Sequence, residues 1–438
     1  MKNIRSSIYG VIDALILPLL MLIATPLFLN YLGVEGYATW ILINSIIASL
    51  AIFNFGGVNV VIKFISAGRG GNDKNTAEEV FSTVFAFQSI AVLLIYALFL
   101  VTVPFVIQYF SSENFLIFLD ILYVAIPVFF LKQSEQLLYA FLRGYEQFGH
   151  MTILSTASKV LFILVQIITA VYTQSVLDVF YGALIVSVLI FIFQFVYLKA
   201  MHKDNISFSK VNVKTAKSLL NFGGWSWLSS LTSMIKADSD KWLVSGLLGL
   251  KTFGFYSIGI LIFNQLYIVV GSSISWIFPN ISKDNLDKRA LAKKYWKLLF
   301  FVSAISLIIS ITLTNLSFLF ELWLGEEFYQ DSQYYINTFL LLFPIFTMVT
   351  VPHFYLLGLG QVKQKSYADI ISLIVKVATI WLVIDTFNIH EWVLFFMVFI
   401  SVEYIAYSKI ISKEMPIKFT HLVIVLLCQM LVILARIQ

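Results

Sequence analysis

Four lysines lie inside long apolar runs of the sequence, where charged side chains are rare. They are Lys132, Lys159, Lys236 and Lys376. A charge at the centre of a lipid bilayer costs about 2.5–3.5 kcal/mol on insertion scales, so an ionisable residue far from a helix end is a functional candidate. About ten residues separate Lys376 from each end of its run, which is a depth of ~15 Å in a hydrocarbon core ~30 Å thick. An ammonium group at that depth could bind an anion.

A structural role is the alternative for each of these lysines. Lys376 could belong to a buried ion pair, although no acid lies three or four residues from it and Asp369 is seven residues away. Lys159 starts nearer to one end of its run, from where its ammonium group could snorkel to water. Lys132 has Glu135 at i+3, a spacing that permits an ion pair on one helix.

The fourth lysine belongs to a group of alternating charges. Lys236 and Asp240 are four residues apart, and Asp238 and Lys241 are three apart. Both spacings place opposite charges on one helix face, so these side chains could neutralise one another.

Composition identifies the elements that position these side chains. The chain has 438 residues, of which 60% are hydrophobic and 12% charged, and its mean hydropathy is +0.90. Soluble domains carry about 25% charged residues. Runs long enough to cross a bilayer as helices fall at about 8–29, 37–62, 80–108, 115–142, 151–173, 177–200, 216–247, 253–280, 295–320, 334–359, 366–385, 389–411 and 418–436. The sequence predicts an all-α polytopic membrane protein.

Charge in the connections predicts the orientation. Lysine and arginine gather at the N-terminus and in every second connection, above all in residues 63–79, 199–217 and 281–297. The other connections hold mostly acidic residues. Cytoplasmic loops carry the excess of Lys and Arg, so the N-terminus and these three segments are predicted to be cytoplasmic.

An internal repeat predicts two similar lobes. Pro127 matches Pro344 and Lys159 matches Lys376, both 217 residues apart, and FLRGYEQFG is echoed by YLLGLGQVK. Leu32-Gly33 recurs as Leu248-Gly249. Because each half holds an even number of helices, both halves have the same orientation, as in parallel-repeat transporters. We predict six-helix lobes at 1–200 and 216–412, a cytoplasmic connection at 201–215 and a thirteenth helix within 413–438. The alternative for 413–438 is an interfacial helix.

At these residues the chain resembles the O-antigen and capsular polysaccharide flippases of the multidrug/oligosaccharidyl-lipid/polysaccharide (MOP) exporter superfamily. The resemblance covers about residues 1–412 and depends on PLFLNYLGVEGYATW, LRGYEQF, DKWLVSGLLG and GFYS. It implies two pseudo-symmetric, MATE-like six-helix lobes around a central cleft. It also implies that the protein flips an undecaprenyl-diphosphate-linked oligosaccharide from the cytoplasmic to the periplasmic leaflet of the bacterial inner membrane, by alternating access.

The resemblance also implies partners and roles. A polysaccharide polymerase and a chain-length regulator are the implied partners, together with membrane lipids and without nucleic acid. The four lysines would bind the diphosphate in the cleft. Ion coupling, by H⁺ or Na⁺, or a gating role is expected for Asp13, Asp240, Lys241 and Glu403, and sugar stacking for Trp225 or Trp227. The alternatives are helix-end positions for Asp13 and Glu403, and lipid or interlobe packing for the tryptophans.

Other functional classes fit the sequence less well. No GxxxxGK[ST] motif is present, which excludes a primary pump within this chain. The single cysteine, Cys428, excludes an internal disulfide, and the five histidines show no metal spacing, so no metal or catalytic residue is expected. A drug/cation antiporter of the same superfamily would favour acids over deep lysines. A lipid II flippase would have two further C-terminal helices. Both remain alternatives.

Overall fold

The computed structural model describes residues 2–50, 57–68, 75–109, 113–202, 211, 213–274, 281, 288–383 and 392–437. Within these residues every regular element is a helix. The helices follow the apolar runs of the sequence. Much of the predicted connection 201–215 lies outside the described residues.

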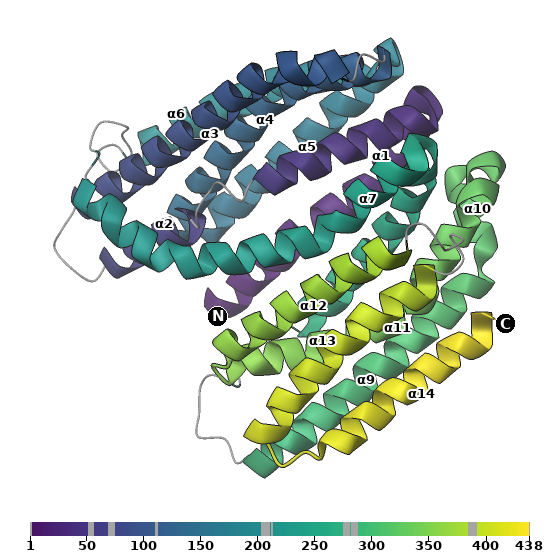
Figure 1. Cartoon of the computed structure of the whole chain (residues 1–438). Helices are drawn as coiled ribbons and strands as arrows, with labels where there is room; N and C mark the ends of the chain where they lie inside the picture. Colours follow the sequence, from purple (N-terminus) through teal and green to yellow (C-terminus); the bar gives the residue numbers. More distant parts are fainter. Residues whose placement is uncertain are drawn as a thin grey trace. The chain divides into compact units, whose positions relative to one another are not determined.

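The helices of the first half are α1 (Lys2–Leu50), α2 (Gly57–Gly68), α3 (Asn75–Tyr109), α4 (Glu113–Gly144), α5 (Phe148–Thr173) and α6 (Val176–Met201) (Figure 1). The second half contains α7 (Val213–Ile274), α9 (Lys288–Asn315), α10 (Ser317–Leu324), α11 (Glu326–Gly358), α12 (Val362–Val383), α13 (Trp392–Glu414) and α14 (Phe419–Ile437). Eight helices in the described part of the chain are long and apolar enough to cross a membrane.

Two of the helices are long enough to cross a membrane twice. α1 has 49 residues and α7 has 62, so at 1.5 Å per residue each exceeds twice the ~30 Å core. α1 bends at Gly33 (φ 72°, ψ 175°), and α7 bends at Gly249 (φ 83°, ψ 167°). This backbone conformation is nearly restricted to glycine. If each bent helix crosses twice, the two bends account for two of the crossings by which the eight counted helices fall short of the predicted spans.

The chain divides into two compact units. Unit 1 contains residues 1–234 and 241–251, and unit 2 contains residues 235–240 and 252–438. The short segment 235–240 of α7 belongs to unit 2, where its side chains contact α12 and α13. The boundaries 1–200 and 216–412 for two equivalent lobes stay a prediction.

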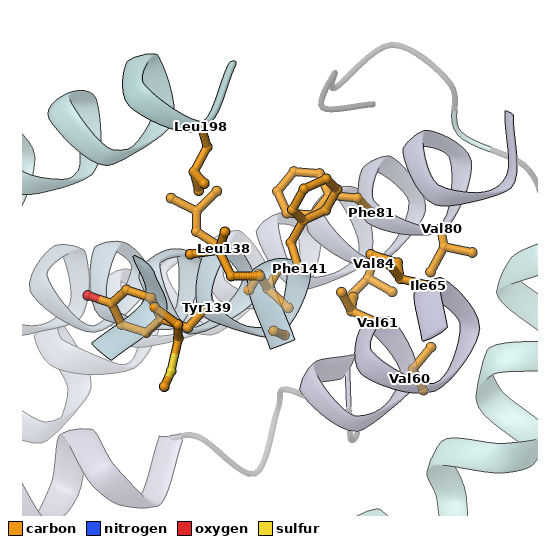
Figure 2. Packing of buried hydrophobic residues seen from close by; sticks show 14 of the residues in the cluster. Val60, Val61, Ile65, Val80, Phe81, Val84, Leu138, Tyr139, Phe141 and Leu198 are labelled. Atoms are coloured by element: carbon orange, nitrogen blue, oxygen red, sulfur yellow. The ribbon is translucent and has the colours of Figure 1, made fainter. Parts of the chain in front are cut away.

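The core of unit 1 lies where α2, α3, α4 and α6 meet (Figure 2). Phe81 of α3 contacts Phe141 of α4 edge to face, with ring centroids 5.8 Å apart. Val61 and Ile65 of α2 and Leu198 of α6 are also buried in this cluster. An edge-to-face aromatic pair contributes about 0.5–1.5 kcal/mol beyond the burial of its area, so these contacts hold the helix ends of unit 1 together.

The core of unit 2 lies between α9, α11 and α13. Tyr295 of α9 contacts Tyr355 of α11 edge to face, with ring centroids 4.9 Å apart. Deeper along the same helices the hydroxyl of Thr347 donates to that of Ser306 at 2.7 Å. Phe339 of α11 packs against Phe396 of α13. Hydrogen bonds between neighbouring helices satisfy hydroxyls that lipid could not.

The turns after α4 and α11 share the same hydrogen bonds. The N–H of Gln147 donates to the carbonyl of Leu142, and the N–H of Gln361 donates to that of Leu356, each at 2.9 Å. The residue before each glutamine has a positive φ, 56° in the first turn and 73° in the second. This is the Schellman closure of a helix C-terminus. The echoed segments FLRGYEQFG and YLLGLGQVK therefore form the same turn in both halves.

The side chains of these two glutamines also repeat a contact. Gln147 Oε1 lies 3.0 Å from Nε2 of His202, which follows α6, and Gln361 Nε2 donates to Oε1 of Glu414, the last residue of α13, at 2.8 Å. Burial, with a smaller contribution from the positive charge of His150, lowers the pKa of His202, so its imidazole is neutral at neutral pH. The turn after α4 thus contacts the end of α6, and the turn after α11 contacts the end of α13.

The C-terminal helix α14 packs alongside the helices of unit 2. It lies against α11 and α13 (Figure 1). Leu422, Leu426 and Ile433 of α14 are buried, and the hydroxyl of Ser401 on α13 lies 3.6 Å from the sulfur of Met430. The segment is thus a helix packed on unit 2, and whether it spans the membrane or lies at its interface stays a prediction.

Candidate functional site

Lys376 of α12 forms a buried ion pair with Asp240 of α7, inside unit 2. Its Nζ donates to Oδ1 of Asp240 at 2.7 Å and to the carbonyl of Lys236 at 2.5 Å. The side chains of the ion pair are 3% and 7% exposed. The hydroxyl of Tyr256 donates to the second carboxylate oxygen at 2.8 Å, and the ring of Phe399 lies 5.4 Å from the ammonium group. Both buried charges are paired and hydrogen-bonded, as their desolvation requires.

Lys236 itself forms an ion pair with Glu403 of α13. The side chain of Lys236 is 21% exposed, and that of Glu403 is 9% exposed. The hydroxyl of Ser372 on α12 lies 3.5 Å from the same carboxylate. The candidate diphosphate ligand Lys236 and the candidate coupling acid Glu403, which are 167 residues apart in the sequence, are therefore in direct contact.

A third ion pair lies about two turns before Lys376 on α12. Lys365 donates to Asp369 at 2.8 Å across one helical turn. The hydroxyl of Tyr407 on α13 donates to the other oxygen of Asp369. The ring of Tyr407 lies 5.8 Å from the Lys365 ammonium group. This contact fixes α12 against α13.

Lys236 and Asp240 of α7 find their partners on other helices, whereas the predicted pair of Asp238 and Lys241 stays a prediction. The spacing of Lys236 and Asp240 allowed an ion pair along α7, but each of them pairs across helices instead. The predicted ion pair between Lys236 and Asp240 is therefore wrong, because Lys236 pairs with Glu403 and Asp240 pairs with Lys376. The reason is packing: the α7 face that carries Lys236 and Asp240 lies against α12 and α13, so Lys376 and Glu403 would be buried without a counter-charge if Lys236 and Asp240 paired with each other.

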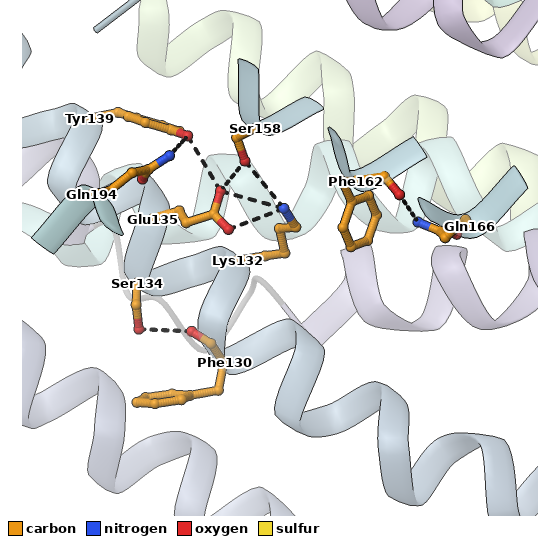
Figure 3. Close-up of polar contacts among 9 residues, drawn as sticks. All are labelled: Phe130, Lys132, Ser134, Glu135, Tyr139, Ser158, Phe162, Gln166 and Gln194. Atoms are coloured by element: carbon orange, nitrogen blue, oxygen red, sulfur yellow. Dashed lines mark hydrogen bonds and ion pairs between the residues drawn. The ribbon is translucent and has the colours of Figure 1, made fainter. Parts of the chain in front are cut away.

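Unit 1 contains a separate polar network around Glu135 of α4 (Figure 3). Lys132 Nζ donates to Glu135 at 3.1 Å, so the i+3 ion pair that the spacing permits is present. The hydroxyl of Ser158 on α5 donates to Glu135 at 2.7 Å, and that of Tyr139 donates at 3.3 Å. Gln194 of α6 donates to the oxygen of Tyr139 at 2.9 Å. The network therefore connects α4, α5 and α6.

Five candidates remain, and three of them have side chains outside the described residues. Lys159 of α5 is half-buried and follows Ser158 directly. Lys241 of α7 is also half-buried. Asp13 lies in α1, and Trp225 and Trp227 lie in α7, but their side chains are outside the described residues. Their proposed coupling and stacking roles stay predictions.

Several polar partners were not foreseen from the sequence. They are Tyr256, Tyr407, Ser158, Tyr139 and Gln194. Each is a single hydroxyl or amide within an apolar run, and many such residues simply bond to their own helix, as Ser134 does to the carbonyl of Phe130. Tyr139 lies at i+4 from Glu135, so its spacing permitted the contact. For the other four residues, sequence spacing does not distinguish a contact between helices from a bond to their own helix. Among the described residues, no three His, Cys, Asp or Glu side chains gather in a way that could hold a metal ion.

Sequence relatives point to one family. The family model described as "Polysaccharide biosynthesis protein" matches residues 42–332. A putative O-antigen transporter of Shigella flexneri is 23% identical over 397 residues, which is 89% of this chain and 93% of that protein. The resemblance read from the turn motifs is confirmed by these matches.

Solved structures confirm the fold class. The inward-facing conformation of a multidrug resistance MATE family transporter of the MOP superfamily superposes with a TM-score of 0.67 at 17% identity, over 92% of this chain and 98% of that one. The lipid II flippase MurJ, in its inward closed conformation, has a TM-score of 0.69 at 16% identity, over 99% of this chain and 97% of that one. These relatives are described as transporters or a flippase, in agreement with the expectation that this chain is not an enzyme. The chain is a multi-pass membrane protein that has the MOP superfamily fold and belongs to the polysaccharide biosynthesis protein family.

Proposed function

We propose that the protein flips an undecaprenyl-diphosphate-linked O-antigen or capsular oligosaccharide from the cytoplasmic to the periplasmic leaflet of the bacterial inner membrane, by alternating access. The observation that carries this proposal is the end-to-end alignment with a putative O-antigen transporter, over 93% of that protein's length. The family match over residues 42–332 supports the same cargo class.

The buried lysines are suited to a doubly charged cargo. A diphosphate that leaves water needs cationic hydrogen-bond donors to replace its hydration. Lys376, Lys236 and Lys132 each carry a carboxylate partner in this conformation. An arriving diphosphate would therefore replace a carboxylate, with Lys159 as a further cation. The released acid could then take up a proton or a cation.

Ion coupling follows from that exchange. Asp240 and Glu403 are the carboxylates that a diphosphate would release in unit 2. Asp13 and Lys241 are retained as further coupling or gating residues, with H⁺ or Na⁺ as the ion. Trp225 or Trp227 would stack on a sugar ring. A polysaccharide polymerase and a chain-length regulator are proposed as partners that take over the flipped cargo.

Orientation is tested with reporter fusions. Fusions at Asn114 and Gln330 are expected to report the periplasm, because the connections next to them are nearly free of Lys and Arg. Fusions at Asn72 and Asp284, which lie outside the described residues, are expected to report the cytoplasm. Exchange of the two patterns at either pair would contradict the proposed orientation.

Deletion of the gene in its own host tests the function. We expect loss of the surface polysaccharide and accumulation of the lipid-linked oligosaccharide on the cytoplasmic side, with both reversed by the wild-type gene. The lipid-linked pool is measured by extraction and mass spectrometry, and its sidedness by lectin access to sealed vesicles. Unchanged polysaccharide with increased drug sensitivity would favour the antiporter alternative. A block in peptidoglycan synthesis would favour the lipid II alternative.

A further inference from the structure

We propose that Glu135 is a proton-exchanging residue that controls the binding of a phosphate-bearing anion at Lys132 in unit 1. The anion would be the diphosphate head group of the cargo, so its identity rests on the proposed function. The proton step is simple: the Glu135 carboxylate takes one proton from the aqueous phase and becomes a neutral carboxylic acid, and the reverse step returns the proton.

Glu135 is enclosed by hydrogen-bond donors. Its side chain is 2% exposed. Ser158 donates to Oε2 at 2.7 Å, Tyr139 donates to the same oxygen at 3.3 Å, and Lys132 donates to Oε1 at 3.1 Å (Figure 3). All three donate to oxygens of the Glu135 carboxylate, and Lys132 is its counter-charge in this structure.

Lys132 is the part of the network that a ligand can reach. Its side chain is 26% exposed, whereas the Lys376 side chain in unit 2 is 3% exposed. The ammonium group also lies 4.0 Å from the centroid of the Phe162 ring and 3.5 Å from the hydroxyl of Ser158. In the described part of unit 1, Glu135 is the carboxylate that pairs with it. An anion could therefore contact Lys132 without first separating two fully buried charges.

The protonated state of Glu135 also has hydrogen-bond partners available. Its new O–H can donate to the oxygen of Ser158 or Tyr139, and the hydroxyl hydrogen of Tyr139 can then turn to Gln194. Gln194 is 2% exposed, and its Oε1 atom has no hydrogen-bond partner. Rotation of the amide by about 180° presents Oε1 instead of Nε2 to Tyr139. The same side chains can thus satisfy both protonation states, as a two-state element requires.

Proton uptake changes the charge that an anion meets. With Glu135 ionised, the pair has no net charge, and a carboxylate occupies the donors of Lys132. With Glu135 protonated, Lys132 is an uncompensated cation in a medium of low dielectric constant, where an anion is strongly attracted. Proton and anion therefore bind with positive coupling, and the coupling is reciprocal.

The groups that face Glu135 from each neighbouring helix are mostly uncharged. On α4 the titratable contacts are Lys132 and Tyr139. α5 contributes the hydroxyl of Ser158, with the half-buried Lys159 next to it in sequence, and α6 contributes the Gln194 amide through Tyr139. The charged side chain that these contacts bring to Glu135 is Lys132.

Diphosphate binding to the purified full-length protein in lipid nanodiscs provides the test. Farnesyl diphosphate serves as the probe, because it carries the head group on a short isoprenoid, and its affinity is measured from about pH 4 to pH 8.5, a range that includes the ordinary pKa of a glutamate, about 4.3. The probe also titrates, so the informative quantity is the ratio of wild-type to Glu135→Gln affinity at each pH. We expect Glu135→Gln to bind about tenfold or more tightly than wild type at pH 8.5, with the ratio approaching one as pH falls. Lys132→Gln should bind weakly at every pH.

Two matched variants complete the design. Tyr139→Phe removes a donor to the ionised carboxylate, so its affinity should stay high to a higher pH than that of wild type. Ser134→Ala lies on the same helix, but its hydroxyl bonds to the carbonyl of Phe130, so this variant should behave as wild type. Tyr139→Phe also keeps the test valid if Glu135→Gln fails to fold.

The binding measurements and the deletion strain can fail independently, so a failure of this inference can be distinguished from a failure of the proposed function. Identical pH profiles for wild type and Glu135→Gln, wild-type binding by Lys132→Gln, or no binding of farnesyl diphosphate would overturn the inference, whatever the deletion strain shows. The expected pH-dependent binding combined with normal surface polysaccharide in the deletion strain would support the site and reject the proposed cargo.

Discussion

Lys376→Ala is expected to destabilise the protein by about 3–5 kcal/mol, because it leaves the carboxylate of Asp240 buried without a cation. The two side chains are 3% and 7% exposed, and the ammonium group also bonds to the carbonyl of Lys236. Reduced yield of folded protein and an earlier thermal transition in detergent would be the measured effects. A stability equal to that of wild type would contradict the buried ion pair.

A second substitution separates the effect on stability from the effect on transport. In the Lys376→Ala variant the buried carboxylate of Asp240 has lost its cation, and Asp240→Asn removes that negative charge while it keeps an acceptor for Tyr256. The double variant Lys376→Ala/Asp240→Asn should therefore recover most of the lost stability. If Lys376 binds the diphosphate, the stable double variant should still fail to export polysaccharide. Loss of one charge-assisted hydrogen bond of about 1.5–3 kcal/mol corresponds to roughly 10- to 150-fold weaker binding. Lys376→Arg should retain more export than Lys376→Gln.

The export measurement can also reject the proposed role of Lys376 in diphosphate binding. Wild-type export by a stable Lys376→Ala/Asp240→Asn variant would reject the diphosphate role of Lys376. The ion pair would then be a purely structural element of unit 2.

Gly259→Ala is expected to disturb the packing of α7 on α11. A Cβ atom at Gly259 would lie 2.8 Å from the backbone oxygen of Tyr335 and 2.8 Å from the Phe339 ring. A backbone atom cannot move aside by rotating, so the two helices must separate. Overpacking of this kind costs about 1–3 kcal/mol. The thermal transition of the purified protein should fall accordingly.

Gly246→Ala is the matched control for this effect. Gly246 lies on the same helix, and a Cβ atom there would meet nothing within 4 Å. Because alanine favours a helix over glycine by about 1 kcal/mol, this variant should be as stable as wild type or slightly more stable. Equal destabilisation by both substitutions would show that helix propensity or insertion, rather than contact with α11, determines the loss.

The asymmetry between the two units bears on mechanism. Both halves share the glycine bends and the turns after α4 and α11. Their described charged contacts differ: unit 1 contains the pair Lys132–Glu135, whereas unit 2 contains two pairs that connect α7 to α12 and α13 and one pair, Lys365–Asp369, within α12. The shared backbone features thus occur with different polar contacts in the two halves.

The sequence by itself determined the class of the protein and the course of its backbone. Run lengths predicted the helices because a helix that spans a bilayer must satisfy its own backbone and be apolar along its whole length, and both are local properties. The echo of FLRGYEQFG in YLLGLGQVK indicated an internal repeat, and both segments form the same turn because Schellman closure depends on a few consecutive residues. The Lys132–Glu135 pair was predictable for the same reason.

Only the tertiary structure decided which charges meet. Lys376 pairs with Asp240, 136 residues away, and Lys236 with Glu403, 167 residues away. On its own helix Asp240 had a suitable cation at i−4, so local spacing favoured the wrong partner. The choice depends on which faces of α7, α12 and α13 pack together, because a buried ion is stable only when a counter-charge from the facing helix reaches it. Which face of a helix points toward its neighbours depends on how the helix is rotated about its own axis. This rotation is set by the packing of all the helices together, and no short stretch of sequence indicates it.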